Sequence, residues 1–289
     1  MIQPRTERVL VAGASGFLGS HIVQELVDRG NRVRALIRDP CKRELTVKAE
    51  ETIAIDLLDA SPRLRHALEG VDVIISAAGQ PCTLKRKVDR RSFRHVDPQI
   101  NRVLLDMAIA CGVRKFIYVT VLAAPRLHEL DYVAAHEEFI ADLKVSAIDH
   151  ATVYANGFFY SYLDLLDFAR RGLAISFADG SARSNPIHEA DLAVACVEAI
   201  ENESHKIEVG GPETFTRREE VELAFAAVGR KTRVVRVPRP LLKAALPLIG
   251  LSDRRRSEML DFLAAISAAD VLAPPQGSRR LGDYLCEHA

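Results

Sequence analysis

Two side chains that can carry a proton, Tyr132 and His136, lie four residues apart in the segment Tyr-Val-Ala-Ala-His. Residues at this spacing share one face of an α-helix, so a phenol and an imidazole would meet there. A free tyrosine has a pKa near 10, and a nearby cation would make the phenol more acidic. A protonated imidazole could supply that charge or relay a proton itself. The alternative is a helix-start tyrosine and a surface histidine without a catalytic role.

Three glycines follow the apolar run 9–12 at three-residue intervals, and a helical pattern over 17–29 follows them. The run is typical of a buried parallel strand. Glycines at such a junction permit a tight turn and a close approach of backbone N–H groups to a pyrophosphate, which the helix N-terminus also attracts. The pattern predicts a dinucleotide site, with a purely structural turn as the alternative. Its members are Gly13, Ser15, Gly16, Phe17, Leu18 and Gly19.

The end of the second predicted strand, residues 32–37, indicates which dinucleotide is preferred. Arg38 stands 19 residues after Gly19, where an acidic residue would bind the ribose 2′-hydroxyl of NAD. An arginine suits a 2′-phosphate instead, so NADP(H) is preferred over NAD(H). Asp39 could bind the hydroxyl if the loop were shifted by one residue.

Strands alternate with helices around these motifs. This alternation predicts an α/β fold with a Rossmann-type doubly wound parallel sheet. The expected division is a NAD(P)-binding Rossmann domain over 1–157 and a smaller substrate-binding or lid region over 158–289, some of whose elements return to the sheet. The expected strands are 52–55, 71–76, 115–120 and 148–154, and the expected helices are 62–68, 98–111 and 133–146.

Composition excludes several classes of function. The 39 basic and 39 acidic side chains of the 289 residues cancel, so no overall positive charge favours nucleic acid. The five cysteines are scattered and form no Cys-x-x-Cys pair, which argues against disulfides and a zinc site and indicates a reducing, cytoplasmic setting. No metal is expected, and the partner is a small-molecule substrate.

Together the motifs resemble the atypical short-chain dehydrogenase/reductase superfamily, on its NmrA-like, NAD(P)-dependent side. The resemblance runs from residue 8 to about 237 and rests on Gly-Ala-Ser-Gly-Phe-Leu-Gly at 13–19 and on the motifs at 38–40, 56–57, 77–79, 101–120, 156–159, 185–191 and 209–212. It implies adenine contacts from Asp56 and Leu57. It also implies a ribose and nicotinamide wall from Ala77, Ala78 and Gly79.

Hydride-transferring members of this superfamily usually carry Tyr-x-x-x-Lys on a helix, with Ser or Thr at the end of the preceding strand. Here Thr120 and Tyr132 match, but His136 replaces the lysine. The resemblance therefore implies Tyr132 or His136 as proton donor and Thr120 as the hydroxyl that orients a carbonyl.

A group of aromatic residues follows the strand at 148–154, where the substrate cleft of this superfamily opens. Aromatic side chains suit an apolar, flat substrate, although some must build the core. The candidates for substrate binding are Phe158, Phe159 and Tyr160, with Tyr162 close by, and polar contacts from Asn156, Asn185 and His188. For Asn185, the alternative is a role in shaping a turn.

Two charged segments remain. The basic segment 85–95 suggests attraction of an anionic substrate or of the cofactor phosphates, against a solvated loop as the alternative. The segment 239–256 combines leucines with basic residues, so it could contact a membrane surface. Pro247 is expected to interrupt a helix there, which favours a hydrophobic lid or a homodimer contact instead.

These features favour an NADP(H)-dependent oxidoreductase that reduces a carbonyl or conjugated double bond of a small, fairly apolar metabolite. Two alternatives stay open. One is a non-catalytic NADP(H)-binding redox sensor, and the other is an isomerase or dehydratase that uses the nucleotide without net redox change.

Overall fold

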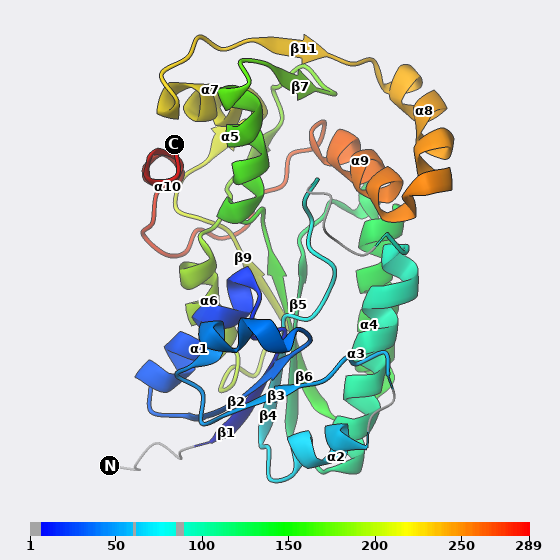
Figure 1. Ribbon diagram of the computed structural model, residues 1–289, viewed down its shortest axis with the longest axis vertical. Coiled ribbons are helices and arrows are strands. Elements are labelled where there is room, and N and C mark those ends of the chain that lie inside the picture. Colours follow the sequence, from blue (N-terminus) through cyan, green and yellow to red (C-terminus); the bar gives the residue numbers. More distant parts are fainter. Residues whose placement is uncertain (1–6, 60–61, 85–89) are drawn as a thin grey trace.

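A seven-stranded sheet forms the centre of the computed structural model, which describes residues 7–59, 62–84 and 90–289 (Figure 1). The strand order is β3-β2-β1-β4-β5-β6-β9, and every neighbouring pair is parallel. The chain order reverses between β1 and β4, and parallel sheets bind ligands at such a point, beyond the carboxyl ends of the strands. The strands are β1 (Arg8–Ala12), β2 (Arg32–Ile37), β3 (Glu51–Ala54), β4 (Val73–Ser76), β5 (Lys115–Val121), β6 (Asp149–Ala155) and β9 (Lys206–Val209).

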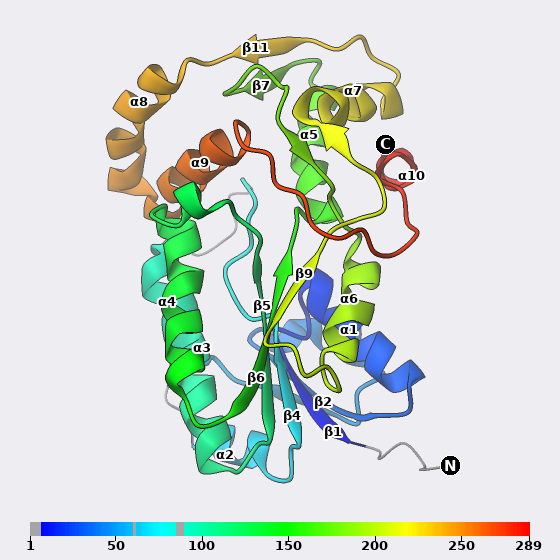
Figure 2. The same ribbon diagram turned by 180° about the vertical axis from the view of Figure 1, so that it is seen from behind.

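Helices cover both faces of this sheet (Figures 1 and 2). One face packs against α1 and α6, and the other against α2, α3 and α4. In β1, Val9 and Val11 belong to the first core and Leu10 and Ala12 to the second, because successive side chains of a strand point to opposite faces. The fold is therefore the expected Rossmann-type α/β fold. The helices are α1 (Phe17–Asp28), α2 (Arg63–Leu68), α3 (Phe93–Ala110), α4 (Asp131–Val145) and α6 (Glu189–Glu198).

The start of α3 differs from the prediction of a helix over 98–111. The helix begins at Phe93, because the Ser92 hydroxyl accepts a hydrogen bond from the Arg94 amide and caps it. Pro98 lies inside the helix rather than at its start. Of the basic segment 85–95, residues 85–89 lie outside the described residues, whereas Arg94 forms an ion pair with Asp131.

Residues beyond β6 build a smaller region beyond the carboxyl ends of the strands and also return to the sheet as α6 and β9. Its core lies among α5, α7 and α10. Two short strand pairs flank it, β7 with β11 in parallel and β8 with β10 antiparallel. The elements are α5 (Tyr162–Arg170), α7 (Arg217–Ala227), α10 (Leu281–Glu287), β7 (Ala174–Ser176), β8 (Arg183–Ser184), β10 (Phe215–Thr216), β11 (Val234–Arg236), and the 3₁₀ turns η1 (Pro40–Thr46), η2 (Pro125–Leu127) and η3 (Phe159–Ser161).

Two further helices, α8 (Arg239–Ser252) and α9 (Arg254–Ile266), cross from this region to the α4 side (Figure 2). Helix α9 packs on α4, where the rings of Phe262 and Tyr132 lie 4.7 Å apart. Helix α8 packs on α9 in turn. Pro247 does not interrupt α8, contrary to expectation. Proline removes one backbone hydrogen bond from a helix, and here tertiary contacts hold the helix regardless.

Candidate functional site

The glycine loop, residues 13–19, joins β1 to α1 at the point where the strand order reverses. Gly13 has φ +77°, and a Cβ there would lie 2.7 Å from the Ala77 carbonyl oxygen. A Cβ on Gly19 would collide with the Gly13 carbonyl. Only glycine fits both positions, so the loop can lie directly against the end of β4.

The N-terminus of α1 is open to a ligand. Gly16 is the N-cap residue and offers no side-chain cap to the first amides of the helix. Gly16 is exposed and Ser15 half-buried, while Leu18 packs into the core. Free amides at a helix N-terminus, together with the helix dipole, bind phosphate groups. The loop therefore forms a cradle that fits a dinucleotide pyrophosphate.

Two charged residues follow β2, and only one of them, Asp39, has a side-chain hydrogen-bond partner among the described residues. Arg38 is exposed and has no ion-pair partner within residues 7–59, 62–84 and 90–289. Asp39 caps η1, since its carboxylate accepts a hydrogen bond from the Cys41 amide at 3.0 Å. Arg38 is thus the side chain that remains available to an anionic group at the end of β2.

The turns after β3 and β4 are held by carboxylate and amide side chains. Asp56 accepts a hydrogen bond from the Leu58 amide at 3.1 Å, and Leu57 is buried in the core. Helix α3 holds the 77–80 turn, because Asn101 donates to the Ala78 carbonyl at 3.1 Å and Asp97 accepts from the Gln80 amide at 2.9 Å. Asp97 was not among the predicted residues, because its role depends on a contact 17 residues along the chain.

Tyr132 and His136 lie buried on α4, with ring centroids 5.1 Å apart and planes at 89°. The His136 Nδ1 atom hydrogen-bonds the Tyr118 hydroxyl at 2.7 Å, and its Nε2 atom has no partner among the described residues. Thr120 is buried at the end of β5, and its hydroxyl likewise has no partner within the described part of the chain.

Burial keeps both rings neutral. It lowers the pKa of His136 to about 4 and raises the pKa of Tyr132 well above its usual value. A neutral imidazole supplies no charge to stabilise a phenolate near neutral pH. We therefore do not assign His136 the role of the missing lysine.

Aromatic rings connect the glycine loop to Tyr132. Phe17, at the tip of the loop, stacks on Tyr160 with centroids 4.5 Å apart and planes 3° from parallel, and Phe158 lies 5.7 Å from Tyr160 on a similar plane. Cys82 lies close enough to both Tyr160 and Tyr132 to raise the pKa of each phenol, although burial is the larger cause. These residues form a continuous apolar wall from the cofactor loop to α4, which we call the aromatic wall.

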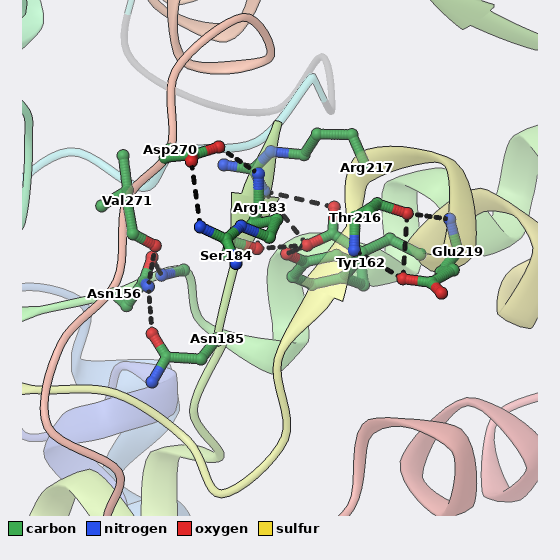
Figure 3. Close-up of polar contacts among 12 residues, drawn as sticks. Asn156, Tyr162, Arg183, Ser184, Asn185, Thr216, Arg217, Glu219, Asp270 and Val271 are labelled. Atoms are coloured by element: carbon green, nitrogen blue, oxygen red, sulfur yellow. Dashed lines mark hydrogen bonds and ion pairs between the residues drawn. The ribbon is translucent and has the colours of Figure 1, made fainter. Parts of the chain in front are cut away.

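The other two aromatics of this segment are structural. Phe159 is fully buried in the core of the smaller region, and the Tyr162 hydroxyl donates to the Glu220 carboxylate at 2.8 Å (Figure 3). Phe159 therefore belongs to the core of the smaller region, where its ring contacts His188 and Tyr284, instead of lining a substrate site.

The predicted polar contacts are also structural. Asn156 donates to the Asn185 side chain and to the Val271 carbonyl, both at 2.7 Å (Figure 3), and Asn185 donates to the Ala273 carbonyl at 2.8 Å. His188 caps α6 by accepting from the Ala190 amide at 3.0 Å. We assign these three side chains to the scaffold that ties residues 271–273 and α6 in place.

A short segment, Pro81–Leu84, lies between the two regions and was not predicted. The buried Arg255 of α9 donates to the Pro81 and Thr83 carbonyls at 2.8 and 3.0 Å. Asp164 of α5 accepts from the Leu84 amide at 2.9 Å. Contacts from both sides thus hold Cys82 against the aromatic wall.

Two open cavities lie elsewhere, with volumes of about 340 and 650 Å³. Arg126 lines both, with Arg239 in the smaller one and Asp270 in the larger one. Their lining includes none of the predicted site residues.

Comparison with known proteins agrees with the loop geometry. The NAD(P)H-binding family matches residues 13–203, from the glycine loop to the residues before β9. The chain belongs to this family. Its homologues fall in the atypical short-chain dehydrogenase/reductase group, on the NmrA-like side that the sequence motifs resemble. The family and the cradle together establish a nicotinamide dinucleotide as the cofactor.

Three curated relatives show how far the likeness extends. The photosystem II assembly factor Ycf39 of a Synechocystis strain is 26% identical over 82% of this chain and 72% of its own length. Divinyl chlorophyllide a 8-vinyl-reductase of Arabidopsis thaliana is 24% identical, and the matched region covers 81% of this chain but only 61% of the relative. The NAD(P)H azoreductase of Xenophilus azovorans is 26% identical over 92% of this chain and 89% of its own length.

Among solved structures, the NADPH-dependent quinone oxidoreductase QOR2 of Escherichia coli, complexed with NADPH, has the same fold. It superposes with a TM-score of 0.70 at 20% identity and covers 97% of this chain and 99% of its own. The family match shows NAD(P)H binding, and the reaction, the substrate and the catalytic residues require a separate argument.

Proposed function

We propose that the protein is an NADPH-dependent reductase of flat, conjugated acceptors such as quinones or azo compounds. The observation that carries this proposal is the aromatic wall. Phe17 of the cofactor loop is stacked on Tyr160, next to Cys82 and Tyr132. Flat aromatic faces favour offset stacking with a flat ligand.

The choice of NADPH rests on Arg38. Its guanidinium is exposed at the end of β2, where a ribose 2′-phosphate would lie. The neighbouring Asp39 carboxylate is engaged by the Cys41 amide. A guanidinium suits a phosphate by geometry and charge.

The neutral state of Tyr132 and His136 points to the class of acceptor. Hydride addition to an isolated ketone needs a well-placed proton donor, because the charge develops on one oxygen, and burial makes the Tyr132 phenol a weaker acid than a free tyrosine. In a quinone or azo compound the developing charge is spread over the conjugated system, so the Thr120 hydroxyl suffices to orient the acceptor and the phenol need only line the site. Reduced nicotinamide supplies the hydride, and solvent supplies the proton that completes the two-electron reduction. Three comparisons support this class by name: the azoreductase, the vinyl-reductase and the quinone oxidoreductase.

The test is NADPH consumption at 340 nm with a quinone, an azo dye, a conjugated enone and an aliphatic aldehyde. We expect turnover of the conjugated acceptors only, and a raised KM for the quinone in Tyr160→Leu. Phe168→Leu, which removes a ring from the core of the smaller region, should leave that KM unchanged. Turnover of the aldehyde alone would contradict the proposed acceptor class.

The second candidate is an NADP(H)-binding sensor without turnover. It is favoured by one observation, that Tyr132 is buried beneath α9 while Arg255 and Asp164 hold Pro81–Leu84 over the cleft. Tight NADPH binding without consumption across the whole panel would support the sensor and contradict the reductase.

A further inference from the structure

Helix α8 presents a row of apolar side chains to solvent. Leu241, Ala244, Leu248 and Leu251 are all exposed, and the three leucines have exposed fractions of 63, 71 and 87%. Their spacing of three and four residues places them along one face of the helix. We call this row the α8 outer face. Leu242, by contrast, is buried.

The strand that leads into α8 also exposes apolar side chains. All three residues of β11 are exposed, with Val234 and Val235 near half exposure, and Ile175 of β7 is similarly exposed. Figure 1 shows β11 and α8 along the end of the molecule farthest from the N-terminus. Large exposed apolar areas on a folded protein usually mark a contact surface.

The segment that carries this surface is rich in basic residues. The segment 230–256 holds nine of the 39 basic side chains of the chain and only one of its 39 acidic ones. Arg239, Lys243 and Arg256 are exposed and form no ion pair with any other described residue. The single acid, Asp253, is engaged as the cap of α9. The neutral charge of the whole chain therefore conceals a basic segment.

We propose that the α8 outer face and β11 bind the surface of an anionic lipid membrane. Exposed leucines and unpaired cations on the same two helices match the two contributions to interfacial binding, burial of apolar side chains among lipids and attraction to anionic headgroups. Nucleic acid would attract the cations but leave the leucines in water. A symmetric contact with a second copy would bring the two basic surfaces together, which like-charge repulsion opposes.

Two structural facts are consistent with a peripheral contact. No helix within the described residues is long and apolar enough to cross a membrane. Pro247 does not break α8, so the leucines stay aligned over the whole helix. This surface is independent of the proposed reductase activity.

The test is co-sedimentation of the full chain with vesicles of phosphatidylcholine alone or mixed with phosphatidylglycerol. We expect binding to the anionic vesicles only, weakened by salt. The double variants Leu248→Asn/Leu251→Asn and Lys243→Glu/Arg256→Glu should each bind roughly tenfold or more weakly.

Matched controls lie at the far end of α4. Val145 is 85% exposed and Lys144 is exposed beside it, so Val145→Asn and Lys144→Glu make the same chemical changes outside the surface. Both controls should bind the vesicles like the wild type. NADPH titration of every variant checks that the fold is retained.

Three results would overturn the proposal. They are no binding to either vesicle, equal binding to both, and equal binding by the surface variants and the controls. Sedimentation velocity is the companion measurement. A dimer that Leu248→Asn/Leu251→Asn abolishes would assign the surface to a second copy of the chain instead.

Discussion

The two sides of the candidate cleft are built from different parts of the chain. The glycine loop uses backbone amides at the open N-terminus of α1. The opposite side uses the side chains of Tyr132 and His136, which lie buried beneath α9 and carry no charge near neutral pH. His136 stands where the superfamily carries lysine, so the second side lacks a cation near the phenol, whereas the backbone amides of the glycine loop are intact.

Gly16→Asp is expected to show the largest effect. Its carboxylate would stand at the N-terminus of α1 and repel the cofactor phosphates, so NADPH should bind about 100-fold or more weakly. The backbone at Gly16 is extended, with φ −79°, and aspartate is a good N-cap, but a Cβ there would lie 3.1 Å from the Gly13 carbonyl oxygen. A modest loss of thermal stability is therefore expected, which Gly16→Asn should share. NADPH fluorescence and thermal unfolding measure the two quantities.

Gly16→Asn is the matched control because it has the same shape without the charge. It should bind NADPH more tightly than the aspartate variant. Equal affinities would show that the phosphates do not lie at this helix end.

Arg38→Ser tests the proposed contact with the ribose 2′-phosphate and should have a smaller effect than Gly16→Asp. Losing a charged hydrogen bond of about 1.5–3 kcal/mol should weaken NADPH binding roughly tenfold to hundredfold and leave NADH binding unchanged. Lys144→Ser, a remote exposed cation, should affect neither. An equal loss for both nucleotides would remove Arg38 from the 2′-phosphate site.

The burial of His136 in its neutral form should make the free energy of unfolding depend on pH. His136 has a pKa near 6.5 when unfolded and about 4 when folded, so between these values the unfolded chain binds more protons. The contribution of the neutral imidazole to the free energy of unfolding is fully present above pH 6.5. It is lost as the pH falls toward 4, and at pH 5 the free energy of unfolding is lower by roughly 2 kcal/mol.

Urea unfolding at pH 7 and pH 5 measures this difference. In His136→Gln the loss on acidification should be smaller, whereas His205→Gln, which changes an exposed histidine, should keep the wild-type loss. An unchanged loss in His136→Gln would mean that the imidazole is not buried in its neutral form.

Tyr132→Phe should have the smallest effect. If the phenol only lines the cleft, turnover of a quinone should change less than about threefold, which corresponds to about 0.6 kcal/mol in the barrier. A several-hundredfold fall in quinone turnover, together with a pH profile that His136→Ala also alters, would show that Tyr132 is the proton donor. The two sides of the site would then both take part in the chemistry.

The sheet and the cofactor loop could be predicted because their signals are local. Apolar runs and helical periodicity span a few residues, and the positions of Gly13 and Gly19 reflect clashes within the same strand–turn–helix unit or with the end of the next strand in the sheet. The start of α3 was misplaced because Pro98 is a weaker boundary signal than the Ser92 cap.

The polar candidates were harder to interpret, because the same side chain can bind a substrate or hold the scaffold. Asn156 and Asn185 are engaged by residues 271–273, more than 80 positions along the chain from either. Arg255 belongs to a basic run in the sequence, yet it is buried and binds the carbonyls of Pro81 and Thr83. Nothing in the local pattern distinguishes it from its exposed neighbour Arg256.

The sequence by itself determined the Rossmann-type sheet, the dinucleotide cradle and the class of cofactor, because strand periodicity and glycine spacing act over short stretches of chain. Only the tertiary structure decided that Tyr132 and His136 are buried, that Phe17 and Tyr160 stack, and that the leucines of α8 face solvent. These properties depend on which distant segment covers each side chain. Burial, and with it protonation state and accessibility, is a property of long-range packing.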